Sequence, residues 1–220
     1  MKREYKFIDL FAGCGGLSLG ASRAGFVGKL AIEYQENAFN TLRHNLIDSK
    51  RVEKRYKSGV LSFDWPEEIE QKNHDINLFL KEHGTYLKGL RGEIDLIIGG
   101  PPCQGFSVMG DKNSADPRNV LFESYVRLVD ELNPKCFVFE NVKGIKTMFK
   151  GRYLEMVANS FSKIGFDIYF KILNSKDYGV PQKRERVIII GTKINNLFSY
   201  PKNNHKSIGK LKAKLNVEES

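Results

Sequence analysis

The sequence predicts a doubly wound α/β fold, with a mostly parallel sheet that helices cover on both faces. Short apolar runs alternate with segments of helical periodicity along most of the 220 residues. The runs are continuous rather than alternating in polarity, which is typical of parallel strands buried on both faces. Turns rich in glycine or proline follow two of these runs, at residues 12–16 and 100–102. Ligands of doubly wound folds bind at such strand ends.

Local patterns place the individual elements. Apolar runs predict six strands, over residues 5–11, 29–33, 94–99, 136–140, 166–173 and 186–191. Apolar residues at helical spacing predict helices over residues 17–24, 36–45, 121–132 and 154–164. Asn133-Pro134 and Gly165 end the last two helices. Residues 50–92 are polar and hold the only tryptophan, so we expect an elaborated connection between strands there.

Composition indicates one globular domain. A length of 220 residues, with 41% hydrophobic and 28% charged residues, suits a single core. We expect this domain over residues 1–195 and a flexible polar tail over residues 196–220. Neither a signal peptide nor a membrane-spanning run is evident, so no membrane partner is expected. The net charge of +9 favours a polyanionic partner such as nucleic acid.

The cysteines and histidines argue against disulfides and metals. Cys14, Cys103 and Cys136 are odd in number and far apart, which favours a reducing compartment such as the cytoplasm. Cys136 lies in a predicted strand and Cys14 in a small-residue position of a turn, so both are expected to be structural. The four histidines show no ligand spacing, and no metal is expected.

A stiff turn presents the remaining cysteine at the end of a predicted strand. Residues 100–107 are Gly-Pro-Pro-Cys-Gln-Gly-Phe-Ser. Pro101 and Pro102 fix the backbone immediately before Cys103. A cysteine retained only for packing does not need such a turn, so Cys103 is predicted to be a nucleophile.

The first strand-turn-helix unit predicts a cofactor loop. Gly13, Gly15 and Gly16 allow the backbone to approach a ligand and leave the N–H groups at a helix start exposed to it. Glu33 ends the second strand, where its carboxylate suits ribose hydroxyls. The glycine spacing departs from the dinucleotide fingerprint, and a glycine-rich turn without a ligand is the alternative.

Two further segments bring charged side chains to strand ends. Glu140 follows a run of apolar residues at the end of its strand, where it is either a buried structural acid or a functional one. Arg184 and Arg186 would point to the same face of the last strand. Paired guanidinium groups suit a phosphate or a base edge and lower the pKa of a nearby thiol, whereas the alternative is a solvated basic edge.

The chain resembles the DNA (cytosine-5)-methyltransferases of bacterial restriction-modification systems. Four motifs carry the resemblance in the family's order and spacing: Asp-Leu-Phe-Ala-Gly-Cys-Gly-Gly at 9–16, the segment 100–107, Glu-Asn-Val at 140–142, and Gln-Lys-Arg-Glu-Arg at 182–186. The match covers about residues 6–192. It implies a Rossmann-like methyltransferase fold that uses S-adenosylmethionine and acts on double-stranded DNA.

The resemblance also implies which residues hold the cofactor. Phe11 would pack on the adenine, Glu33 would hold the ribose, and Asp75 and Ile76 would contact the adenine. Leu121 would line the pocket. The full expected set is Phe11, Gly13, Gly15, Gly16, Leu17, Glu33, Tyr34, Asp75, Ile76, Pro101 and Leu121.

In this family's chemistry the Cys103 thiolate adds to carbon 6 of cytosine, because carbon 5 alone is too weak a nucleophile to accept a methyl group. Glu140, in protonated form, would donate to ring nitrogen 3. Arg184 and Arg186 would orient the base and maintain the thiolate. The target must be flipped out of the duplex. DNA contacts are expected from Gln104, Ser107, Lys112 and Arg118.

One part of the family pattern is not found. Members normally continue into a target-recognition domain and a closing motif, whereas here about thirty residues follow Gly191. Three interpretations remain open: the catalytic subunit of a split enzyme, a truncated product, or an inert module that binds cofactor or DNA. A tRNA cytosine-5 methyltransferase is a further alternative, although the residues after Cys103 resemble the DNA enzymes more closely.

Overall fold

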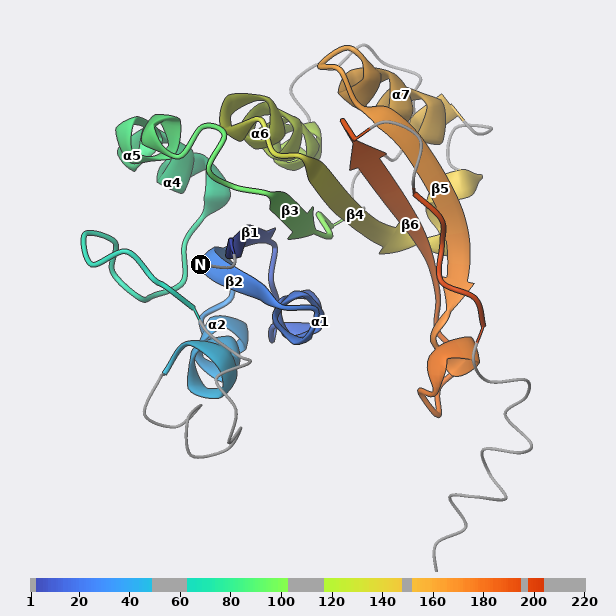
Figure 1. Ribbon diagram of the computed structural model, residues 1–220, viewed down its shortest axis with the longest axis horizontal. Coiled ribbons are helices and arrows are strands. Elements are labelled where there is room, and N and C mark those ends of the chain that lie inside the picture. Colours follow the sequence, from blue (N-terminus) through green and yellow to red (C-terminus); the bar gives the residue numbers. More distant parts are fainter. Residues whose placement is uncertain (1–2, 49–62, 103–116, 148–151, 195–197, 204–220) are drawn as a thin grey trace, which may run out of the picture.

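The computed structural model describes residues 3–48, 63–102, 117–147, 152–194 and 198–203 (Figure 1). One six-stranded sheet has the order β2-β1-β3-β4-β6-β5. Its strands are β1 Tyr5–Leu10, β2 Phe26–Ile32, β3 Leu96–Gly99, β4 Cys136–Val142, β5 Asp167–Asn174 and β6 Glu185–Thr192. The pairs among β1, β2, β3 and β4 are parallel, and β6 is antiparallel to both β4 and β5. The prediction of a mostly parallel sheet is therefore confirmed.

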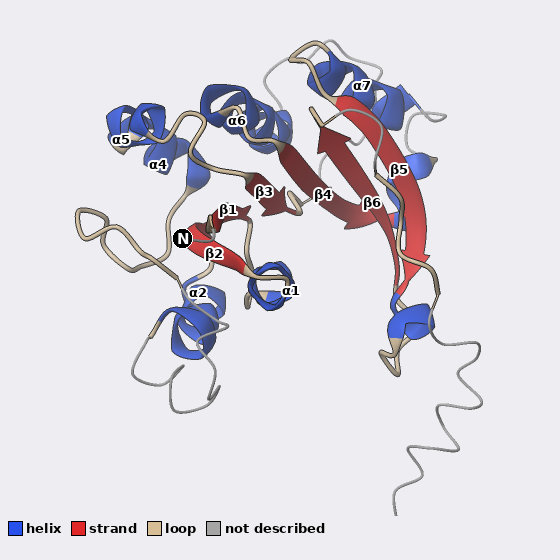
Figure 2. Ribbon diagram, in the orientation of Figure 1, coloured by secondary structure: helices blue, strands red, loops and turns tan. Residues whose placement is uncertain are grey.

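Helices lie on both faces of the sheet, as expected (Figure 2). They are α1 Gly16–Arg23, α2 Glu36–Leu42, α4 Ile76–Glu82, α5 Gly84–Gly89, α6 Pro117–Leu132 and α7 Arg152–Ser162. The π-helical turn η1 spans Arg43–Ile47, and the 3₁₀ turns η2 and η4 span Lys143–Lys146 and Ser175–Tyr178. Ala21 of α1 packs with Phe7 and Ile98 on one face. On the opposite face α6 and α7 place Tyr125 and Phe161 against β4.

The structure shifts several predicted boundaries for physical reasons. The first strand ends at Leu10 instead of Phe11, because Phe11 adopts a left-handed φ of 58°. The second begins at Phe26, three residues earlier than expected. The connection over residues 50–92 contains α4 and α5. Its Phe63 also forms a parallel bridge with Gly28 of β2. The Phe63 ring occupies the space that a side chain at position 28 would need, which explains the glycine there.

Residues 198–203 lie against β5 and β6, where the last coloured segment of Figure 1 runs beside the two strands. The Phe198 ring contacts that of Tyr169 at 5.6 Å, and the Tyr200 hydroxyl donates to the Ile188 carbonyl at 2.8 Å. The Tyr178 hydroxyl donates to the Pro201 carbonyl at 3.2 Å. The predicted tail from residue 204 onward lies outside the described residues.

The carboxyl ends of β1, β2, β3 and β4 meet at one side of the sheet, which we call the carboxyl edge. Because β6 runs the other way, its first residues, Glu185 and Arg186, lie at the same edge. The topology therefore gathers the ends of five strands in one place. No helix in the described part of the chain is long and apolar enough to cross a membrane.

Candidate active site

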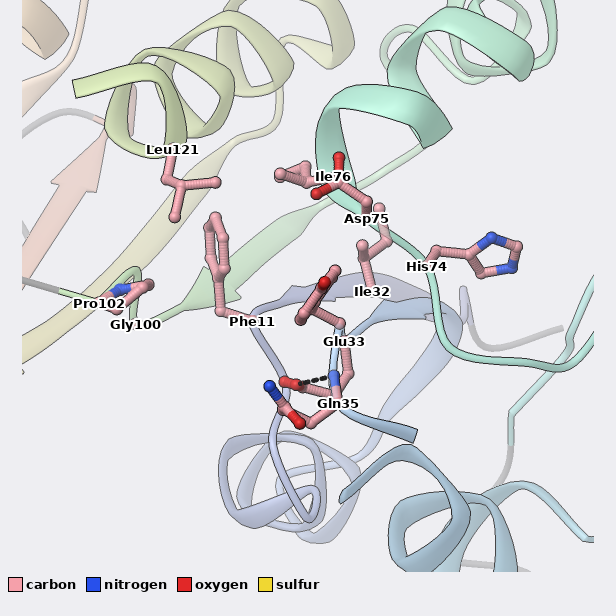
Figure 3. Close-up of a pocket in the computed structure, with 11 residues that line it drawn as sticks. Phe11, Ile32, Glu33, Gln35, His74, Asp75, Ile76, Gly100, Pro102 and Leu121 are labelled. Atoms are coloured by element: carbon pink, nitrogen blue, oxygen red, sulfur yellow. Dashed lines mark hydrogen bonds between the residues drawn. The ribbon is translucent and has the colours of Figure 1, made fainter. Parts of the chain in front are cut away.

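A pocket of about 500 Å³ opens at the carboxyl edge (Figure 3). The segments after β1, β2 and β3 form its floor and sides, and the first residues of α4 together with α6 complete its wall. The lining residues are Phe11, Ile32, Glu33, Tyr34, Gln35, His74, Asp75, Ile76, Gly100, Pro102 and Leu121. The lining is largely apolar, with two carboxylates, a combination that suits an adenosyl group.

The backbone of Phe11 is held in an unusual conformation at the pocket. Its φ of 58° is uncommon for a residue with a bulky side chain, and such backbone outliers cluster at ligand sites. The ring extends into the pocket and points toward Leu121 (Figure 3). An aromatic face at this position offers a flat surface on which a purine ring can stack.

Glu33 connects the glycine loop to the end of β2. Its Oε2 accepts a hydrogen bond from the backbone N–H of Gly13 at 2.8 Å, and its Oε1 accepts from the N–H of Gln35 at 2.7 Å. Each carboxylate oxygen keeps a second lone pair that can accept from a hydroxyl. Gly13 thus contacts the Glu33 carboxylate but is not among the residues that line the pocket.

Residues 73–76 run beside the end of β2 and close the pocket. The His74 N–H donates to the Glu33 carbonyl at 2.8 Å, which fixes this alignment. Asp75 is the N-cap of α4, and its Oδ1 accepts from the N–H groups of Asn77 and Leu78. The Asp75 carboxylate thus has a structural role that leaves its Oδ2 available to a ligand. Burial lowers the pKa of His74, whose ring packs on Phe79.

Glu140 and Arg186 form an ion pair at the carboxyl edge. Arg186 Nε lies 3.0 Å from Glu140 Oε1, and each side chain is about one-quarter exposed. The antiparallel register pairs Glu140 with Ile188 and Val142 with Arg186, which sets the two charged residues diagonally on one face. The Arg186 guanidinium group thereby holds the Glu140 carboxyl group in one position.

The turn that leads to Cys103 rests on these β4 residues. A Cβ atom on Gly100 would lie 2.8 Å from Glu140 Oε2 and 3.1 Å from its carbonyl oxygen, so a larger residue would force the turn or the Glu140 side chain to shift. The buried side chain of Asn141 donates from Nδ2 to the Pro101 carbonyl at 3.1 Å. Its Oδ1 accepts from the N–H of Val142 at 2.7 Å. Two contacts therefore fix the start of the turn relative to Glu140.

A buried acid lies beneath the glycine loop. Asp9 is fully buried, and its Oδ2 accepts from the Ser18 hydroxyl at 2.6 Å, which joins β1 to α1. Its Oδ1 has no hydrogen-bond partner among the described residues. Burial raises the pKa of Asp9 to about 7, despite the opposing hydrogen bonds from Ser18. The motif containing Asp9 was recognised in the sequence, but the acid was not assigned a role, although an acid inside an apolar strand was the available signal.

The structure brings together only part of the expected site. The expected cofactor residues that line the pocket are Phe11, Glu33, Tyr34, Asp75, Ile76 and Leu121. The expected residues outside its lining are Gly13, Gly15, Gly16, Leu17 and Pro101. The lining residues that sequence reasoning missed are Ile32, Gln35, His74, Gly100 and Pro102. Each missed residue is adjacent in sequence to an expected one, so proximity along the chain was the available signal.

The other residues singled out in the sequence lie outside the pocket or outside the described part of the chain. Arg184 is exposed and precedes β6, whose first residue is Glu185, so it is not within that strand. Burial raises the pKa of the Cys136 thiol to about 11, which agrees with a structural role. The residues whose side chains lie outside the described part of the structure are Cys103, Gln104, Ser107, Lys112 and Arg118.

Comparison with known proteins associates this geometry with one family. A family model described as C-5 cytosine-specific DNA methylase matches residues 5–219. The type II methyltransferase M.AquIA of Picosynechococcus sp. is 36% identical over 211 residues, which are 92% of this chain and 77% of the relative. The type II methyltransferase M.DdeI of Desulfomicrobium norvegicum is 41% identical over 189 residues, covering 84% of this chain and 40% of the relative.

A solved structure supports the same association. A crystal structure described as a DNA modification methyltransferase encoded within a prophage (E. coli) superposes with a TM-score of 0.63 at 36% identity. The match covers 86% of this chain and 47% of that one. The chain thus spans most of M.AquIA but less than half of M.DdeI and of the prophage protein.

Proposed function

Because the chain belongs to the family of C-5 cytosine-specific DNA methylases, we propose that it transfers a methyl group from S-adenosylmethionine to carbon 5 of cytosine in DNA. Its relatives are type II methyltransferases, which makes a restriction-modification system its natural setting. A bacterial cytoplasm, where the chromosome is accessible, is the corresponding location.

The pocket at the carboxyl edge is the proposed cofactor site. Phe11 and Ile76 would sandwich the adenine, and the free lone pairs of Glu33 would accept from the ribose hydroxyls. Asp75 Oδ2 would accept from the adenine amino group, since Oδ1 is occupied by the α4 N-cap. When bound, S-adenosylmethionine supplies the electrophilic methyl group.

The residues of the chain would activate the cytosine. The Cys103 thiolate adds to carbon 6, and the electron pair displaced from the 5,6 double bond makes carbon 5 nucleophilic. Glu140, in protonated form, donates to ring nitrogen 3 and stabilises the charge that develops there. Arg186 holds the Glu140 carboxyl group in place. After methyl transfer a base removes the proton on carbon 5, and the sulfur–carbon 6 bond breaks.

One relationship carries this proposal: Gly100 brings the turn before Cys103 into contact with Glu140, which in turn is paired with Arg186. The turn that precedes Cys103 therefore reaches a paired carboxyl and guanidinium group beside the pocket, which Gly100 and Pro102 also line. A thiol, a carboxyl group and a guanidinium group next to a cofactor pocket are the set that addition to cytosine requires.

Substrate choice is a separate part of the proposal. The target cytosine would be extruded from duplex DNA, because carbon 6 is inaccessible in a stacked helix. We propose that a second polypeptide carrying a recognition domain selects the sequence in which this cytosine lies. In this chain itself, the residues expected to contact DNA, without selecting the sequence, are Gln104, Ser107, Lys112 and Arg118.

Methyl incorporation tests the function. The chain, alone and with a candidate recognition polypeptide, is incubated with methyl-labelled S-adenosylmethionine and either duplex DNA or tRNA. We expect 5-methylcytosine in hydrolysed DNA, and Cys103→Ala should abolish it. Label in tRNA alone would favour the RNA alternative, and no label in either nucleic acid would favour an inert binding module.

A further inference from the structure

Four exposed cations lie at the carboxyl edge beside the Glu140–Arg186 pair. Lys143 and Lys146 belong to η2, directly after β4, and Lys183 and Arg184 directly precede β6. We call them the β4–β6 cationic surface. Lys143, Lys146 and Lys183 have no role in the cofactor pocket or in the proposed activation of cytosine, whereas Arg184 also belongs to the expected catalytic set.

Strand pairing holds the two parts of this surface together. The β4–β6 register extends to Val142 opposite Arg186, so the residues that follow β4 and those that precede β6 leave the sheet side by side. Lys143 Nζ lies 3.1 Å from Glu185 Oε2, which links the two segments directly. Residues at i and i+3 of a 3₁₀ turn lie on the same face, which aligns Lys143 with Lys146. The buried Ile145 anchors the turn.

The local charge is positive and only partly compensated. Residues 140–147 and 174–186 contain six Lys and Arg residues and three Asp and Glu residues, a net charge of +3. Two of the three acids are already paired, Glu140 with Arg186 and Glu185 with Lys143. The side chain of Lys143 remains 56% exposed despite its ion pair. The surface therefore retains charge for a polyanion.

Position distinguishes this surface from an ordinary solvated lysine face. A cytosine can reach Glu140 only while joined to the phosphates on both of its sides, and these phosphates must then lie at the carboxyl edge. We propose that the β4–β6 cationic surface binds the phosphates of duplex DNA next to the flipped cytosine. This inference rests on the proposed function and adds a set of contacts to it.

The salt dependence of DNA binding tests the inference. Each phosphate contact contributes about −0.9 to the slope of log K against log salt concentration. The triple variant Lys143→Gln/Lys146→Gln/Lys183→Gln should therefore reduce the magnitude of the slope by up to about 2.7. Arg184 is left intact because it belongs to the expected catalytic set. Binding is measured with the whole chain and a cytosine-containing duplex.

A matched control removes the same charge elsewhere. Lys81, Lys88 and Lys163 are exposed and lie in α4, in α5 and directly after α7. Their replacement by Gln should leave the slope close to that of the wild type. Equal slope changes in the two triple variants, or no change in either, would overturn the inference. So would failure of the wild-type chain to bind duplex DNA at low salt, or a greater loss of affinity for tRNA than for duplex DNA.

Parallel trapping with a 5-fluorocytosine duplex separates this surface from the chemistry. One outcome is a smaller salt slope in the first triple variant alone, with no covalent trapping by the wild type. That outcome would support phosphate binding by the β4–β6 cationic surface while contradicting the proposed function. Trapping by the wild type with an unchanged slope in the first triple variant would support the function while contradicting the surface.

Discussion

The side-chain amide of Asn141 donates to the Pro101 carbonyl at 3.1 Å, and this bond ties the end of β4 to the turn that leads to Cys103. In Asn141→Asp an oxygen would replace the donor and face that carbonyl. The variant keeps an acceptor for the N–H of Val142. We expect the rate of covalent trapping to fall by about 10- to 100-fold, because a small displacement of a reacting group costs that much.

Two measurements distinguish this effect from unfolding. Loss of a buried hydrogen bond should lower the free energy of unfolding by about 1–3 kcal/mol, so trapping is measured well below the melting temperature. S-adenosylmethionine affinity should change little, since Asn141 does not line the pocket. Equal losses in cofactor affinity and trapping rate would argue against a positioning role.

Gly100→Ala should also disturb the contact between β4 and the turn that leads to Cys103, but here the change is in the turn rather than in β4. The new Cβ would lie 2.8 Å from Glu140 Oε2 and 3.1 Å from the less mobile Glu140 carbonyl, so the turn or the carboxylate must shift. We expect a loss of methyl transfer of roughly 10- to 100-fold. Gly89→Ala is the control, since no atom of the described part of the chain lies within 4 Å of the added atom. Similar activities of the two variants would contradict the predicted contact.

Glu33→Gln should weaken cofactor binding. The Glu33 carboxylate accepts N–H bonds on both oxygens, and an amide would turn an N–H donor toward one of those backbone donors. Hydrogen bonds to charged groups contribute about 1.5–3 kcal/mol, so we expect roughly 10- to 100-fold weaker S-adenosylmethionine binding by calorimetry. Glu36→Gln, in the exposed first turn of α2, should bind normally. Unchanged affinity in both variants would remove Glu33 from the cofactor site.

Asp9 predicts a pH dependence of stability. Its pKa rises from an ordinary value of 3.8 to about 7 in the folded chain. Its contribution is therefore fully present below about pH 4 and is lost as the pH rises toward 7, by roughly 1.4 kcal/mol per pH unit at most. Asp9→Asn stays neutral and keeps an acceptor for Ser18.

Urea unfolding from about pH 5 to about pH 8 checks this prediction. The stability of Asp9→Asn relative to the wild type should increase with pH and level off above 7. Asp130→Asn, at an exposed position of α6, should follow the wild-type profile. Parallel profiles for Asp9→Asn and the wild type would show that Asp9 does not titrate in this range.

Much of the architecture could be predicted from local sequence. The strands are short apolar runs, so the aromatic ring of Phe11 and the carboxyl groups of Glu33 and Glu140 stood out near strand ends in the sequence. Their convergence follows from the parallel topology. Long-range geometry could not be predicted in the same way. The Asn141–Pro101 bond joins residues forty positions apart, and the Gly100–Glu140 contact depends on how closely two strands approach.

Long-range contacts also explain why the residues lining the proposed cofactor site differ from those that the sequence predicted. The sequence predicted that the glycines approach a ligand, and it gave no sign of the hydrogen bond that the Gly13 N–H donates to Glu33. His74 enters the lining because its N–H pairs with the Glu33 carbonyl. Periodicity carries no information about such a pairing between a loop and a strand end.

The central claim is that Cys103 attacks a cytosine held beside Glu140, and covalent trapping tests it most directly. A duplex containing 5-fluorocytosine is incubated with S-adenosylmethionine and the chain, alone and with a candidate recognition polypeptide. Denaturing electrophoresis and mass spectrometry should show a protein–DNA adduct carrying the transferred methyl group, and Cys103→Ala should form none. The absence of any adduct in both conditions, or an adduct that persists in Cys103→Ala, would contradict the account.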